Sequence, residues 1–140
     1  KMATPVYGKQ FIRFAETGLV PDATALDQFT IVATTGATEP PSLAILEDGG
    51  TAFGIIQQSV PAVDADKATT LARLATVATS GLLLVAADGA NMQVQGDPLK
   101  GNSTGLSSSA GLAVVVGVST PIVRQQVVIG GVSMVLVSFN

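Results

Sequence analysis

The chain has 140 residues, of which 47% are hydrophobic and only 12% are charged, and its net charge at neutral pH is −3. This length suits a single domain with a substantial core, while the few scattered basic residues argue against binding to a nucleic-acid backbone. The chain has no cysteine and no histidine, which excludes a disulfide framework and removes the usual catalytic base and imidazole metal ligand. We therefore expect a structural or binding protein, not an enzyme, and one that uses no cofactor and no metal ion.

The low charge also bears on partners and location. A soluble domain usually carries about 25% charged residues, so we expect other copies of this chain to cover part of its surface. No apolar run approaches the roughly 18 residues of a membrane-spanning helix, and the first nine residues lack the apolar core of a signal peptide. We expect no membrane partner and no nucleic-acid partner, and a protein that is made in the cytoplasm.

Residues 1–20 differ from the rest because they combine basic and aromatic side chains. Glycine and proline separate this segment from the residues after it, which leaves two interpretations open: an edge strand of the main domain, or an arm that packs on a partner. Aromatic residues and arginine are enriched in interface cores, so we divide the chain into an N-terminal arm, 1–20, and a main domain, 21–140. The candidate partner-binding residues are Tyr7, Lys9, Phe11, Arg13 and Phe14.

Alternating and β-branched segments predict strands along the rest of the chain. The expected strands are 28–34, 42–46, 52–59, 70–79, 81–85, 91–95 and 132–139. The spacing of the alanines between residues 64 and 78 also suits a helix, but threonine and valine favour a strand there. Residues 96–111 are rich in serine and glycine, and we expect a long loop that is mobile or ordered by a partner.

One sequence pattern occurs twice in the chain. Each copy has a glycine within a β-branched strand, then a proline, then a second strand; the copies are 50–61 leading to 71–77, and 111–121 leading to 132–139. This duplication predicts an all-β fold, in the form of a single-domain β-sandwich or barrel-like body with two similar halves.

The last expected strand is apolar on both faces. A strand that faces water on one side alternates with polar residues, so 132–139 must lie between layers or in a subunit interface. From residue 103 to the end, Arg124 is the one charged residue, which favours self-association, and a trimer is our preferred state. The candidate oligomer-interface residues are Val132, Met134, Val135, Val137 and Phe139.

Two segments partly match catalytic motifs. The serines of 105–111 lack the Gly-x-Ser-x-Gly spacing of a serine elbow and any base partner. Asp88 is followed directly by Gly89, whereas an aspartic-protease site needs threonine or serine between them and a second carboxylate. We interpret these segments as a loop and a turn.

The strands and turns occur in a recognisable order. Gly54-Ile-Ile lies in a strand and leads, after a turn, to a second strand at 71–77; Thr79-Ser-Gly-Leu-Leu-Leu-Val-Ala-Ala-Asp88-Gly89 comes next. Val116-Gly117-Val then leads to Val135-Leu-Val137. Over residues 25–137 this order resembles the small capsid decoration (cement) proteins of tailed bacteriophages. The chain departs from that pattern in lacking an acidic residue after Gly81 and in having a longer loop before Gly111.

The resemblance implies a β-sandwich or barrel-like structural protein on the outer capsid surface of the virion, often a homotrimer. Such a protein binds the major capsid protein and holds neighbouring capsid subunits together against the pressure of the DNA. Two alternatives stay open: a phage tail-tube, fibre or baseplate subunit, and a bacterial surface or pilus-like adhesion module. A ring-forming hexamer would favour the tail protein, whereas a soluble trimer that binds emptied bacteriophage heads would favour the decoration protein.

Overall fold

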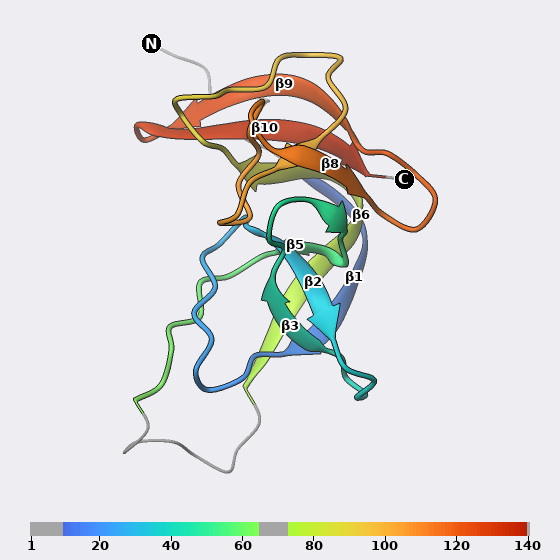
Figure 1. Cartoon of the computed structure of the whole chain (residues 1–140), viewed down its shortest axis with the longest axis vertical. Coiled ribbons are helices and arrows are strands. Elements are labelled where there is room, and N and C mark those ends of the chain that lie inside the picture. The colour runs from blue at the N-terminus through green and yellow to red at the C-terminus, as the bar shows by residue number, and fades with distance from the viewer. Residues whose placement is uncertain (1–9, 65–72, 140) are drawn as a thin grey trace.

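The computed structural model describes residues 10–64 and 73–139, and within these ranges it contains strands and no helix. The all-β prediction is therefore confirmed (Figure 1). The strands are β1 (Phe11–Leu19), β2 (Ile31–Thr35), β3 (Ser42–Ile45), β4 (Gly50–Thr51), β5 (Gly54–Ile56), β6 (Leu74–Ala86), β7 (Lys100–Gly101), β8 (Leu112–Val115), β9 (Ile122–Ile129) and β10 (Val132–Phe139).

The main sheet has seven strands in the order β1-β3-β2-β5-β6-β10-β9. Because β1 also pairs with β6, the first five of these strands close into a ring of hydrogen-bonded neighbours. The two contacts of β1 are unequal: it runs antiparallel to β6 along its whole length, but it meets β3 only where Leu19 lies opposite Ser42. A second sheet of three short strands, β4-β8-β7, packs beside the hairpin of β9 and β10.

β6 connects the ring to this hairpin. Its first half pairs with β5 and its second half with β10, and it spans 13 residues. Figure 1 shows β6 and β1 running together from the ring towards the hairpin. At Gly81 the two strands lie too close for a side chain, because φ is +127° and an added Cβ would lie 2.1 Å from the carbonyl oxygen of Phe11. Only glycine suits this position, because a side chain would separate the strands.

The core extends through both parts of the molecule. One cluster of buried side chains joins Ile31 and Ile55 in the ring to Leu83, Val135 and Phe139 near the hairpin. A second cluster fills the far end of the ring, and a third covers the opposite face of β6 and β10. Burial of this apolar surface is the main favourable contribution to folding, at about 25 cal/mol per Å².

A single arginine closes the far end of the ring. Arg73 lies immediately before β6, and its Nε is 3.5 Å from a carboxylate oxygen of Asp22. Its guanidinium also donates to the backbone carbonyl oxygens of Val20, Pro21, Thr24 and Pro61. The side chain therefore ties two loops to the start of β6 through charge-assisted hydrogen bonds.

Several expected strands are present with shifted ends. Segments 28–34 and 42–46 correspond to β2 and β3, and 81–85 lies within β6. Residues 74–79 of the expected strand 70–79 are also strand, continuous with 81–85, so the strand interpretation is confirmed there over the helical one. Residues 70–72 of that segment lie outside the described residues.

Two expectations about the second half of the chain are wrong, and one strand was not predicted. Residues 91–95 form a turn and loop instead of a strand, and residues 122–129, which we had not assigned, form β9. The loop 96–111 is packed into the body and contains β7, with Leu99, Ser107 and Ser108 buried. The cause lies in the side chain of Gln93, which turns inward and holds this loop through hydrogen bonds.

The expectation of two similar halves is also wrong, because the strands of the two copies pair with different partners. In the first copy β5 pairs with β6, but in the second copy β8 pairs with β4 and β7 and not with β10. The two glycines differ as well. Glycine is required at position 54 because a Cβ there would lie 2.2 Å from the carbonyl oxygen of Ala78. Gly117 instead lies in an open turn, where its φ of +62° favours glycine.

The boundary between an arm and a body at residue 20 is not a structural boundary. Residues 11–19 form β1, which pairs with β6 from Phe11 opposite Leu82 to Leu19 opposite Leu74. The edge-strand alternative therefore describes this segment, because its backbone hydrogen bonds are made within the main sheet. Residues 1–9, including Tyr7 and Lys9, lie outside the described residues.

Val135 offers a direct test of the core. It is fully buried in the cluster that joins the two parts, so Val135→Asp should destabilise the protein by about 3 kcal/mol or more, because a carboxylate would lose its hydration there. Thermal melting should show a midpoint lower by about 10 °C or more, or no cooperative transition. Val118→Asp is the matched control, since Val118 is fully exposed, and an equal effect of both substitutions would contradict this description of the core.

Candidate partner-binding surfaces

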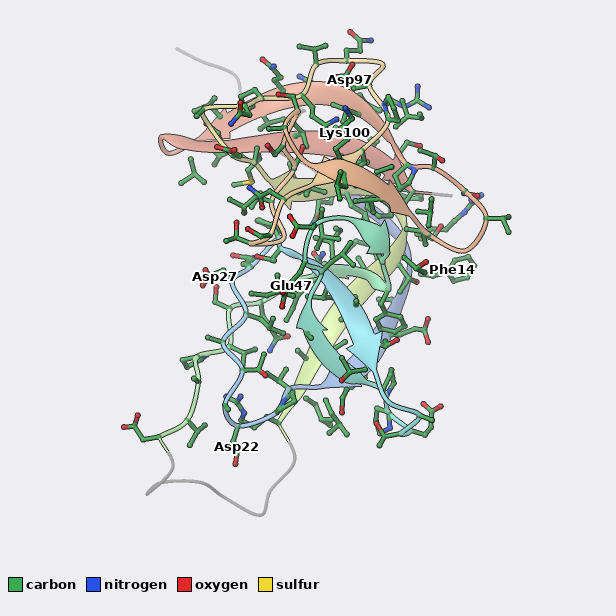
Figure 2. The ribbon with its side chains drawn as sticks, viewed as in Figure 1. Phe14, Asp22, Asp27, Glu47, Asp97 and Lys100 are labelled. Atoms are coloured by element: carbon green, nitrogen blue, oxygen red, sulfur yellow. The ribbon has the colours of Figure 1, made fainter. Side chains whose placement is uncertain are left out.

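β1 presents exposed apolar and charged side chains on the outside of the ring. Phe11 and Phe14 are 68% and 65% exposed, and Ile12 and Arg13 are also exposed. Figure 2 shows Phe14 projecting away from the body. Large aromatic side chains seldom remain this accessible in a soluble domain without a partner, so β1 is the first candidate surface.

The backbone of β1 adds a second feature to this surface. Over residues 11–17 the described pairing of β1 is with β6, on one side of the strand. Among the described residues, no strand pairs with the other side of β1 over this range, and such a sheet edge is a template for pairing with another chain. Two irregularities in the register, between Ile12 and Phe14 and between Phe14 and Ala15, twist this edge.

A small hollow of about 160 Å³ lies at the start of β1. Phe11 and Arg13 line it together with residues of β6 and the end of β10, namely Gly81, Leu82, Ser138 and Phe139. The structure thus brings two of the five predicted partner-binding residues to one hollow and places Phe14 on the same strand. The hollow could receive one partner side chain, with Arg13 available to pair with a carboxylate.

The predicted oligomer-interface residues divide into two groups. Met134, Val135, Val137 and Phe139 are buried within the chain, so they cannot contact a second copy, and this part of the prediction is wrong. Both faces of β10 are apolar because clusters of this same chain cover both faces. Val132 differs, since it is 54% exposed.

Val132 belongs to an apolar surface that was not predicted from the sequence. It lies at the turn between β9 and β10, where Val128 is 60% exposed and Ile129 is also exposed. We call residues 128–132 the hairpin tip. The sequence signal was Gly130-Gly131 between β-branched residues, which is typical of a tight hairpin turn.

A groove of about 740 Å³ lies next to the hairpin tip. Its lining comes from the residues before β2, the end of β3, the end of β6 and the turn after it, the loop between β7 and β8, and the start of β10. The lining residues are Asp27, Gln28, Thr30, Ile45, Ala86, Ala87, Gly89, Thr104, Leu106, Val132 and Ser133. Most of these side chains are small or apolar, as in sites that take apolar ligands. Asp27, labelled in Figure 2, supplies a carboxylate to this lining.

The turn that comes after β6 is organised by Asp88. Its carboxylate accepts hydrogen bonds from the Asn91 side chain at 3.0 Å, from the Ala90 backbone at 3.1 Å and from the Ser108 hydroxyl at 3.2 Å. These bonds, that of Asn91 foremost, lower the pKa of Asp88. The carboxylate therefore fixes a turn and a loop, in agreement with the turn predicted at this position.

Nothing in the described ranges resembles a metal centre, because no three acidic side chains gather there. No helix long and apolar enough to cross a membrane occurs there either. Every buried side-chain nitrogen or oxygen of the described residues has a hydrogen-bond partner. Two surfaces of the described residues, β1 and the hairpin tip with its groove, are therefore our candidates for partner contact.

Comparison with known proteins adds no assignment. The chain matches no protein-family model, and a search of curated proteins finds no significant match.

The hydrogen bonds of Asp88 predict how stability depends on pH. The folded state holds the pKa of Asp88 below its unfolded value, so this group stabilises the fold above the unfolded pKa and loses that contribution as the pH falls through the folded pKa. Because the chain has no histidine, the melting midpoint should be nearly constant from about pH 8 to pH 5 and should fall below about pH 4.

Asp88→Asn tests this assignment in the same melting series. The variant should be less stable than the wild type at pH 7 and should lose less stability on acidification. An acid dependence identical to that of the wild type would show that other carboxylates determine it.

Proposed function

We propose that this protein is a capsid decoration (cement) protein of a tailed bacteriophage, which binds the outer surface of the head and stabilises contacts between major capsid subunits. Two observations support this proposal: the order of strands and turns along residues 25–137, and the exposed aromatic edge of β1. The second carries more weight, because Phe11 and Phe14 together expose apolar area that a partner would cover.

The β1 surface suits a capsid partner in three ways. Its open edge can bind an extended segment of the partner through backbone hydrogen bonds, which is a general mode of strand recognition. Phe11 and Phe14 supply the apolar anchors that dominate most interfaces. Arg13 can pair with an acidic residue beside the small hollow, which would fix the register of the bound segment.

The remaining parts of the proposal concern assembly and location. Self-association, with a trimer preferred, agrees with the low charge of the chain and with the exposed hairpin tip. The protein would be made in the host cytoplasm and would reside on the outside of the virion. A tail-tube, fibre or baseplate subunit is the second candidate, and it differs in the expected oligomer.

A co-sedimentation experiment tests the function. The protein would be mixed with expanded heads assembled from the major capsid protein encoded nearest to its gene, and the bound fraction would be measured after sedimentation. Saturable binding at a fixed ratio to capsid subunits is the expected result. Failure to bind such heads, together with hexameric rings in electron micrographs, would support the tail subunit and contradict the decoration protein.

Phe14→Asp tests which surface binds. Because Phe14 is exposed, the variant should melt like the wild type, while its affinity for heads should fall by about tenfold or more, the size of effect expected from losing an aromatic anchor. Val118→Asp, at a position that is still more exposed and distant in sequence, should bind normally. If Phe14→Asp binds heads as tightly as the wild type, the capsid contact does not lie on β1.

A further inference from the structure

The groove of about 740 Å³ continues onto the hairpin tip through one shared residue. Val132 lines the groove and is also exposed at the tip, whereas Val128 and Ile129 lie outside the lining. Ile45 and Leu106 contribute further apolar side chains to the lining. Sites of about 300–1,000 Å³ enclose ligands that carry several apolar groups, so the groove is large enough for more than one side chain of a partner.

Asp27 places a negative charge in this otherwise uncharged lining (Figure 2). Its side chain is exposed, and none of the basic residues in ranges 10–64 and 73–139 lines the groove. The ion pair found in those ranges joins Arg73 to Asp22, at the far end of the ring. The carboxylate of Asp27 is therefore available to a cation that a ligand brings.

The turn beside the groove adds further negative charge. Glu47 and Asp48 follow closely after Ile45 of the lining, and both side chains are exposed. The backbone N–H of Asp48 donates to the carbonyl oxygen of Asn102 at 3.2 Å, and Asn102 belongs to the same loop as Thr104 of the lining. Three exposed carboxylates thus lie in or beside the groove.

The backbone that carries Asp27 is fixed by its neighbours. Phe29 has a φ of +69°, a left-handed conformation that is rare for an aromatic residue. Its N–H donates to the carbonyl oxygen of Ile56 and its carbonyl oxygen accepts from the N–H of Ala86, both at 2.8 Å. Backbone outliers of this kind persist where surrounding contacts impose them, and they cluster at ligand sites. This wall of the groove needs no ordering when a ligand binds, which lowers the entropy cost of binding.

We infer that the groove binds an extended peptide segment of another protein, in which a lysine or arginine is flanked by apolar residues. The apolar side chains occupy the groove and cover Val132, and the cation pairs with Asp27 through charge-assisted hydrogen bonds. Complementary charge selects this occupant. An anionic lipid surface, or a second copy of a chain whose net charge is −3, meets carboxylates here and is disfavoured. The groove is separate from β1, so this contact goes beyond the proposed binding to the capsid.

Two peptides that differ in one charge test the inference. The probes are acetyl-Val-Leu-Arg-Val-Leu-amide and acetyl-Val-Leu-Glu-Val-Leu-amide, each titrated into the isotope-labelled full chain while backbone amide resonances are followed by NMR. The arginine peptide should shift the resonances of Asp27, Leu106 and Val132 in a saturable way. The glutamate peptide should bind about fivefold more weakly or less, the size of effect expected from one exposed ion pair. Equal affinity for the two peptides, or no saturable shift in the groove, would overturn the inference.

Variants separate the role of the charge from that of the apolar contact. Asp27→Asn should melt like the wild type, because the side chain is exposed, while its affinity for the arginine peptide should fall by about fivefold. Glu16→Gln removes an equal charge from an exposed position of β1 and is the matched control, with unchanged binding. Val132→Ser should weaken both peptides, because it removes apolar contact without changing charge. If Asp27→Asn keeps the wild-type affinity for the arginine peptide, the carboxylate takes no part and the inference is wrong.

Dilution of the wild type alone tests for a second copy in the groove. The resonances of the lining residues should stay constant from millimolar to micromolar concentration. Lining resonances that move on dilution would identify another copy of the chain as the occupant and would contradict the inference. Since none of these measurements involves heads, their failure would leave capsid binding by β1 unaffected.

Discussion

The structure depends on one long strand that two parts of the fold share. The ring pairs with the first half of β6 and the hairpin with its second half, while β1 runs beside it across the junction. Loss of this strand would divide the main core, because Leu83 and Val85 of β6 lie in the cluster that joins both parts. The arrangement requires Gly81, whose missing side chain lets β1 stay paired where the partner of β6 changes.

The long loops are held by polar side chains instead of by sheet pairing. Gln93 is buried, and its amide donates to the Pro98 carbonyl at 2.7 Å while its oxygen accepts from the Lys100 backbone and from the Ser107 hydroxyl, both at 2.9 Å. The buried amide of Gln93 is thus compensated at both ends, which avoids the penalty of an unpaired buried group. These bonds hold the loop 96–111, whose residues Thr104 and Leu106 line the groove.

The sequence predicts the class of this fold well and its pairing poorly. The apolar residues of 42–46 and the valines of 132–139 predict strands, because strand preference is local. Gly54 and Gly117 occupy similar positions in the sequence pattern but have different roles in the structure. Gly54 is required because β6 passes close to it, whereas Gly117 is required by its own turn. The exposure of Phe11 and Phe14 suits the predicted partner site, whereas Val135 and Val137 are buried, since apolar pattern alone cannot tell a core from an interface.

The antiparallel pairing of β1 with β6 has a mechanical consequence. Backbone hydrogen bonds in such a ladder lie perpendicular to the strands, so a pull along β1 loads all of them together in shear instead of opening them one at a time. A load that reaches the molecule through the outer face of β1 would pass into β6 and from there into the hairpin. β6 would therefore carry the load between the ring and the hairpin, whereas the single contact of β1 with β3 at Leu19 lies outside this path.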